Sequence, residues 1–81
     1  MDPNELQVAV GRTIRELRAK QGYSQEAFAV HVGLHRTYMG GVERSERNIG
    51  VHNLARIADA LDMQICDLFG LVENPDEDGD R

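Results

Sequence analysis

Residues 24–43 constrain the fold more than any other part of this 81-residue chain. Ser24 predicts the start of a short helix and Gly33 its end, because a serine hydroxyl caps free backbone N–H groups and glycine accepts a left-handed conformation. The residues between them place three apolar side chains on one face: Phe28, Ala29 and Val32. A second short helix is predicted from residue 35 or 36 to residue 43. Two short helices joined by a glycine-containing turn form a helix-turn-helix pattern.

Apolar residues at helical spacing predict three further helices. The first covers about residues 6–21 and ends at Gly22; its apolar stripe is Leu6, Val10, Ile14 and Leu17. The fourth has the stripe Val51, Leu54, Ile57, Ala58 and Leu61. The fifth covers about residues 65–69 and ends at Gly70. Because no strand-like alternation or repeat interrupts this pattern, we predict an all-α fold, a compact five-helix domain with the helix-turn-helix at its second and third helices.

The length allows one small domain. Residues 6–72 are predicted to form it, after a flexible N-terminus at residues 1–5. Residues 73–81 carry five acids, one base and no large apolar side chain, so an acidic, disordered tail is predicted there.

The formal net charge of −5 is concentrated at the two ends of the chain. Residues 73–81 contribute −4 and residues 1–5 contribute −2, which leaves +1 for residues 6–72. Within residues 11–48, seven bases stand against four acids. The overall acidity therefore does not exclude a nucleic-acid partner.

The residue pattern does not support a catalytic or metal-binding function. His31 and His35 stand four apart, but Gly33 interrupts the helix between them and no Cys or acid completes a zinc site. No serine or cysteine nucleophile has an evident histidine and carboxylate partner. The one cysteine, Cys66, lies among apolar residues and is predicted to be a buried structural thiol. We expect no enzyme activity, no metal and no cofactor.

Four motifs resemble, in order and spacing, the Cro/repressor-type helix-turn-helix regulators, also called the XRE family. They are Ser24-Gln25-Glu26, Gly33-Leu34, Val42-Glu43-Arg44 and Leu54-x-x-Ile57-Ala58-x-Ala60-Leu61. The resemblance covers about residues 10–69 and implies a lambda-repressor-like fold and a DNA-binding transcriptional regulator, bacterial or phage-encoded. Because no apolar run approaches the ~20 residues that cross a bilayer, we expect a cytoplasmic protein, nucleoid-associated when bound. Whether such a regulator is an activator or a repressor depends on where its operator lies.

A second string of residues is similar to a narrower group, the restriction–modification controller proteins. The string comprises Arg36-Thr37-Tyr38, Glu43-Arg44 and Arg47-Asn48. It implies a homodimer that binds a pseudo-palindromic operator in double-stranded DNA, with no membrane partner or small-molecule ligand evident. An antitoxin-type protein-interaction module that also binds DNA is the alternative. His35 departs from the group, whose members carry a small or acidic N-cap residue there.

In a helix-turn-helix, the N-terminal residues of the second helix contact base edges in the major groove. Here these residues are His35, Arg36 and Thr37, and Arg36 is predicted to contact guanine O6 and N7. Tyr38 offers a hydroxyl to phosphate and a ring face to sugar or base. Phosphate contacts are predicted for Gln25, Arg44, Arg47 and Asn48. For each arginine, a solvated surface charge is the alternative.

Gly40 and Gly41 lie inside this predicted helix, where each costs ~1 kcal/mol relative to alanine. They predict a close approach of another backbone, from DNA or protein. Related repressors use the position of Gly41 for a third base-reading side chain, so we expect reduced direct readout, with more weight on DNA shape and on Arg36. Early fraying of the helix is the alternative.

The resemblance also implies a structural ion pair between Arg18 in the first helix and Glu43 at the end of the third. A separate expectation concerns the fifth helix, whose apolar residues exceed what so short a helix can bury within its own domain. With part of the fourth helix, these residues are predicted to form a two-fold dimer interface: Ile65, Leu68, Phe69 and Leu71.

Overall fold

The computed structural model describes residues 1–74, and over that range it contains five helices and no strand. The helices are α1 (Pro3–Lys20), α2 (Gln25–Val32), α3 (Arg36–Glu43), α4 (Val51–Ala60) and α5 (Ile65–Glu73). The predicted all-α class and five-helix architecture are thereby confirmed. None of the five helices is both long and apolar enough to cross a membrane. The acidic tail predicted for residues 73–81 lies outside the described residues from residue 75 onward.

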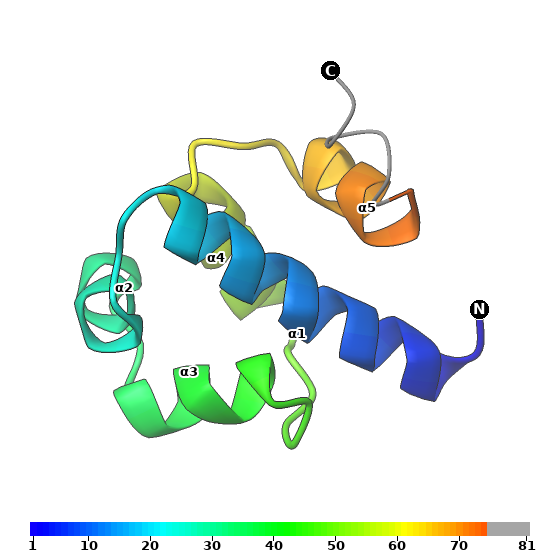
Figure 1. Cartoon of the computed structure of the whole chain (residues 1–81), viewed down its shortest axis with the longest axis horizontal. Coiled ribbons are helices and arrows are strands. Elements are labelled where there is room, and N and C mark those ends of the chain that lie inside the picture. The colour runs from blue at the N-terminus through cyan, green and yellow to red at the C-terminus, as the bar shows by residue number, and fades with distance from the viewer. Residues whose placement is uncertain (75–81) are drawn as a thin grey trace.

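Helix α1 crosses the centre of the molecule, with α2 and α3 on one side of it and α5 on the other (Figure 1). It packs against both α3 and α5, while α2 packs against α3 and α4, and α4 also packs against α5. The pair α2 and α3 is the helix-turn-helix, and it is supported from behind by α1 and α4.

Helix α1 begins at Pro3, earlier than the predicted start at residue 6. It therefore includes part of the segment 1–5 that was expected to be flexible. A capping box fixes this start. Asp2 Oδ1 accepts a hydrogen bond of 2.8 Å from the Glu5 N–H, and the Asp2 N–H donates to Glu5 Oε1 at 2.9 Å. Proline at the first helical position also stabilises this helix start, because its fixed φ suits that position.

Helix α2 has the bounds that its two end residues predict. The Ser24 hydroxyl accepts a hydrogen bond of 3.0 Å from the Ala27 N–H, and Gly33 ends the helix in the left-handed conformation with φ 87°. The two ends of α2 are therefore encoded locally, by one cap and one glycine.

The core is mainly aliphatic, with Phe28 as its buried aromatic residue, and draws on all five helices. The largest fully buried side chains are those of Phe28, Ile14, Met39, Ile57, Leu61, Leu68, Val42 and Val72. One exception corrects the predicted stripe of α4, because Val51 is 79% exposed. Val51 stands at the first position of the helix, where it lines an open hollow rather than a packed core.

Helix α5 is longer than predicted, because it continues through Gly70 to Glu73. Val72, expected to trail the helix, is 1% exposed and belongs to the main core cluster. Its burial offsets the roughly 1 kcal/mol that a glycine costs within a helix. Gly22 and Gly33 have positive φ and stand at helix ends, whereas Gly70 stays inside the helix.

Two predictions about α5 side chains were wrong. Leu68, assigned to a dimer interface, is 0% exposed and packs with Leu54 and Ala58 inside the protomer. Cys66, predicted to be buried, is exposed. Both errors concern which face of α5 is buried. Each helical residue turns the chain by about 100°, so residues 66 and 68 lie on nearly opposite faces. The face that buries Leu68 therefore leaves Cys66 in solvent.

Helices α1 and α3 approach each other closely at Gly11, which the sequence pattern did not single out. A Cβ atom at Gly11 would lie 3.1 Å from the carbonyl oxygen of Glu43 and closer still to that of Val42. The contact with the Val42 carbonyl is shorter than real Cβ atoms tolerate, and backbone oxygens of a helix cannot rotate away. Glycine at this position therefore lets the C-terminal end of α3 lie directly on α1.

We predict that Gly11→Ala lowers the free energy of unfolding by about 1–3 kcal/mol, the usual cost of overpacking. Urea unfolding followed by circular dichroism measures the change. Gly70→Ala is the matched control, because an added Cβ there meets no atom within 4 Å. The control should be neutral or stabilising by up to ~1 kcal/mol. A Gly11→Ala variant as stable as the wild type would contradict the proposed contact.

Candidate nucleic-acid interface

The start of α3 is capped by a histidine. His35 Nδ1 accepts a hydrogen bond of 3.1 Å from the Thr37 N–H, with an extended backbone at His35. The ring nitrogen thus takes the place of the side-chain oxygen of Ser or Asp. An accepting Nδ1 is unprotonated, so the ring proton is carried by Nε2. Residues 35, 36 and 37 are all exposed, which leaves the tip of the helix open to a partner.

Tyr38, the next residue, is half-buried rather than free. Its hydroxyl accepts a hydrogen bond of 3.2 Å from Asn53 Nδ2 on α4. The hydroxyl proton remains available for donation. Tyr38 therefore links α3 to α4 and keeps one donor for an outside acceptor.

Within the protein, side chains rather than another backbone lie next to Gly40 and Gly41. Both glycines are buried within α3, and what approaches them is the protein's own arginine side chains. A Cβ at Gly40 would lie 2.9 Å from Arg44 Nη1, and one at Gly41 would lie 2.9 Å from Arg47 Cγ. The helix continues past both glycines to Glu43, so the early fraying that was the alternative does not occur. Both arginines follow closely in sequence, and Arg44 is the C-cap of α3, so their side chains can lie back over the glycines.

The residues after α3 form a basic, exposed segment that includes Arg44, Arg47 and Asn48. Arg44 Nη2 donates to Glu46 Oε1 at 3.1 Å. This hydrogen bond and the charge of the carboxylate raise the pKa of Arg44, which stays protonated. The side chains of Arg47 and Asn48 also line an apolar hollow of about 260 Å³ between α1, α4 and α5.

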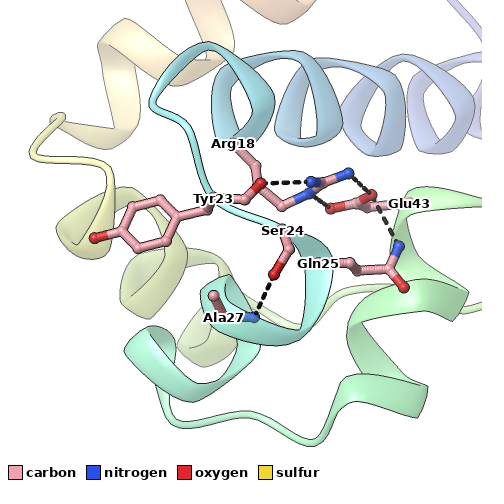
Figure 2. Close-up of polar contacts among 6 residues, drawn as sticks. All are labelled: Arg18, Tyr23, Ser24, Gln25, Ala27 and Glu43. Carbon is pink, nitrogen blue, oxygen red and sulfur yellow. Dashed lines mark hydrogen bonds and ion pairs between the residues drawn. The ribbon is translucent and has the colours of Figure 1, made fainter.

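A buried ion pair joins α1 to the end of α3, as the family resemblance implied. Arg18 Nε donates to Glu43 Oε2 at 2.7 Å, and Arg18 Nη2 donates to Oε1 at 3.0 Å. The two side chains are 13% and 1% exposed. Figure 2 shows that Arg18 also reaches the turn before α2, where its Nη1 donates to the Tyr23 carbonyl at 2.8 Å. The bidentate geometry is the strong form of this interaction.

Gln25, predicted to contact phosphate, is attached to the same pair. Its Nε2 donates to Glu43 Oε1 at 3.1 Å (Figure 2). One N–H of the amide is used in this bond and the other remains to donate. The first residue of α2 is therefore oriented by the last residue of α3.

Arg56 on α4 holds the turn between α2 and α3. Its Nη2 donates to the carbonyls of Val32 at 3.0 Å and Gly33 at 2.9 Å. Carbonyls at a helix C-terminus lack intrahelical donors, and a cation there is favourable. Because Arg56 lies more than twenty positions along the chain from its acceptors, no local spacing could have identified this role.

The N-terminal ends of α2 and α3 border a polar hollow of about 410 Å³. It is lined by Ser24, Gln25, Glu26, Arg36, Thr37, Gly40 and Arg44. Across it, Arg36 Nη1 donates to Glu26 Oε2 at 2.7 Å. Four of the predicted DNA-contacting residues therefore share one surface with the free N–H groups of two helix starts: Gln25, Arg36, Thr37 and Arg44.

The two histidines weighed as zinc ligands serve different contacts. His31 stacks on the ring of Tyr23, with centroids 5.1 Å apart, and its Nε2 lies 3.3 Å from the Ala60 carbonyl. His35 caps α3. Within residues 1–74, no group of three or more His, Cys, Asp or Glu side chains could hold a metal ion.

The profile of the helix-turn-helix family matches residues 14–68, a span that runs from the middle of α1 into α5. The chain belongs to this family. It is a DNA-binding transcriptional regulator of the Cro/repressor type, as the family resemblance implies. In helix-turn-helix terms, α3 is the recognition helix and α2 the helix that precedes it.

Several helix-turn-helix relatives are controller proteins. The chain is 38% identical to control protein C.BamHI of Bacillus amyloliquefaciens over 67 residues, 82% of this chain and 83% of that protein. It is 39% identical to control protein C.SmaI of Serratia marcescens over 69 residues, 85% of this chain and 79% of that protein. The crystal structure of the restriction-modification controller protein C.AhdI from Aeromonas hydrophila is similar with a TM-score of 0.74 at 46% identity, covering 78% of this chain and 96% of that one.

We predict that Arg18→Met lowers the free energy of unfolding by about 3–5 kcal/mol, because it leaves the Glu43 carboxylate buried without its cation. Urea denaturation at neutral pH measures this loss. Arg44→Met is the control, since it removes the same kind of side chain from an exposed pair, with 57% and 61% exposed partners. The control should change stability little. Equal losses of unfolding free energy in the two variants would show that the buried Arg18 pair contributes no more to stability than the exposed pair.

Proposed function

We propose that this regulator binds a pseudo-palindromic DNA operator as a homodimer, with α3 of each protomer in the major groove. The observation that carries the proposal is the exposed start of α3 beside the polar hollow. Arg36 is there with its side chain 65% exposed, and Thr37 is exposed next to it. Helix α2 crosses behind this tip, which is the arrangement in which a second helix can enter the groove.

Base contacts are assigned to the exposed tip of α3. Arg36 presents a planar fork that matches guanine O6 and N7, and Thr37 offers a hydroxyl and a methyl group. His35 caps the helix through Nδ1 and keeps the proton on Nε2 for an acceptor on the DNA. Gly41 has no side chain and lies under Arg47, so direct readout rests on the first turn of the helix.

Phosphate contacts are assigned to the two borders of this tip. Gln25 keeps one amide N–H and stands at the start of α2, where the free backbone N–H groups favour an anion. Arg44, Arg47 and Asn48 follow α3 on the exposed loop, and Tyr38 retains its hydroxyl proton. Such contacts fix the register of the protein on DNA and carry no sequence code themselves.

Dimerisation is assigned to the partly exposed apolar residues of α5. Ile65, Phe69 and Leu71 are half-buried in the protomer, whereas Leu68 belongs to its interior and is excluded. Val51 at the start of α4 adds an exposed apolar side chain, and with Phe69 it lines the hollow between α1, α4 and α5. Two recognition helices would then read half-sites about one helical turn, ~34 Å, apart.

The similarity to control proteins supports a further assignment of the regulated genes. We infer that the operator controls genes of a restriction–modification system, because the similar structure of C.AhdI is that of a restriction-modification controller protein.

Selection of bound duplexes from random DNA tests the readout. We expect the wild type to enrich an inverted repeat and Arg36→Ala to lose a guanine in each half-site, a preference of roughly 5- to 150-fold for a bidentate contact. Arg15→Ala is the control, because it removes the same charge from an exposed position on α1. It should keep the same repeat.

The absence of any enriched sequence at moderate salt would refute operator binding by this surface. Enrichment of the same repeat by Arg36→Ala would refute the role of Arg36 while leaving operator binding in place.

Sedimentation velocity tests the interface. We expect a dimer at tens of micromolar for the wild type, and for Leu71→Glu an increase of about tenfold or more in the dissociation constant, because an unpaired carboxylate would lose its hydration. Val30→Glu is the control: Val30 is 81% exposed on α2, and its replacement should leave the dimer intact. A monomeric wild type, or equal effects of the two variants, would refute this interface.

A further inference from the structure

An exposed ion pair bridges the two helix starts of the helix-turn-helix. Arg36 Nη1 lies 2.7 Å from Glu26 Oε2, and the side chains are 65% and 71% exposed. Glu26 is the second residue of α2, and Arg36 is the first residue of α3. The proposed function assigns a role to Arg36 and none to its partner, although the partner is an acid at a surface that is to face DNA phosphates.

The geometry of the pair leaves the reading edge of Arg36 open. A guanidinium carries five N–H donors, and a bidentate contact through one edge uses Nε and Nη2. Arg18 uses that edge for Glu43, since its Nε and Nη2 both donate to the carboxylate. Arg36 bonds to Glu26 through Nη1. Its Nε and Nη2 edge can therefore contact guanine O6 and N7 while the ion pair persists.

A long arginine side chain at a DNA surface has a competing partner in the phosphate backbone. Phosphates attract it without regard to sequence, and they supply most of the non-specific affinity of DNA-binding proteins. Because Glu26 lies next to Arg36, a phosphate bound by Arg36 would also lie near the Glu26 carboxylate, and the two anions would repel each other. A guanine edge carries no net charge and does not meet that repulsion. The pair therefore favours the base-reading position of Arg36 over the phosphate-bound one.

We propose that Glu26 is a specificity-determining residue: it positions the Arg36 guanidinium for guanine and opposes the use of Arg36 on phosphates. The inference rests on the proposed function, because it needs Arg36 to read a base. It assigns Glu26 an effect on the ratio of affinities for two DNA sequences. A role in capping α2 alone would change stability and leave that ratio unaltered.

Glu26→Gln tests the proposal, because it keeps the size of the side chain and removes its charge. Two duplexes are used: the operator recovered by selection, and the same duplex with the Arg36-dependent guanine replaced by adenine in each half-site. Fluorescence anisotropy at one fixed salt concentration measures both affinities. We expect the guanine-to-adenine affinity ratio to fall by about two- to fivefold, the range open to an exposed ion pair. Affinity for the adenine duplex should rise.

Glu46→Gln is the matched control. It removes the same charge and also breaks an exposed Arg–Glu pair, that of Arg44 and Glu46 at 3.1 Å. Loss of a negative charge should raise affinity for both duplexes alike, so the ratio should stay at the wild-type value. A fall of the ratio in Glu46→Gln equal to that in Glu26→Gln would overturn the proposal, because net charge alone would then explain the effect.

A double-mutant cycle separates action through Arg36 from any other action of Glu26. In an Arg36→Ala background, Glu26→Gln should no longer change the ratio. A ratio that still falls, or one that Glu26→Gln leaves unchanged in the otherwise wild-type protein, would overturn the inference while leaving the proposed function intact. If the wild type itself prefers no sequence, both the proposed function and this inference fail. Thermal unfolding of each variant identifies any that are not folded.

Discussion

The buried pair of Arg18 and Glu43 is the interaction on which the arrangement of the DNA-binding helices depends. The Arg18 guanidinium donates to the Glu43 carboxylate at the end of α3 and to the carbonyl of Tyr23 in the turn before α2. The same carboxylate accepts a hydrogen bond from the amide of Gln25. A charge taken from water must find such partners or destabilise the fold. Helix α3 is only eight residues long and would not be stable alone. Its C-terminal end is therefore fixed to α1 by a buried carboxylate that is bonded to the Arg18 guanidinium.

The rest of the scaffold acts on the same two helices from other directions. Gly11 allows α3 to lie against α1 at backbone distance, and Arg56 of α4 binds the carbonyls of the turn at Val32 and Gly33. Tyr38 adds a bond from α3 to Asn53. Contacts from α1 and α4 thus hold the inner side of the helix-turn-helix, and they leave its outer tip without core packing. An exposed tip on a rigid support suits base readout, because side chains ordered by their scaffold lose less entropy on binding.

The exposed start of α3 has both basic groups that attract phosphate and an acid that opposes it. Arginines after α3 and the helix starts favour an anionic partner without regard to sequence. Glu26 is an acid at the start of α2, bonded to Arg36 through one nitrogen. If phosphate attraction acted alone, Arg36 would be drawn to the DNA backbone. On the proposal made above, the neighbouring Glu26 carboxylate favours the position of Arg36 at the base edge. A short recognition helix with glycines in its second half can then still discriminate sequences.

The sequence by itself determined the elements that depend on neighbouring residues. Ser24 and Gly33 set the bounds of α2, and periodic apolar residues identified all five helices, because caps and stripes act within a few positions. Side chains that act across the fold were decided by tertiary structure alone. Arg56 bonds to the turn between α2 and α3, and Leu68, expected at a dimer interface, is buried against α4. In each case the partner comes from another helix or from beyond the helix end. Burial and long-range hydrogen bonding depend on how helices are placed relative to one another, and no local pattern contains that placement.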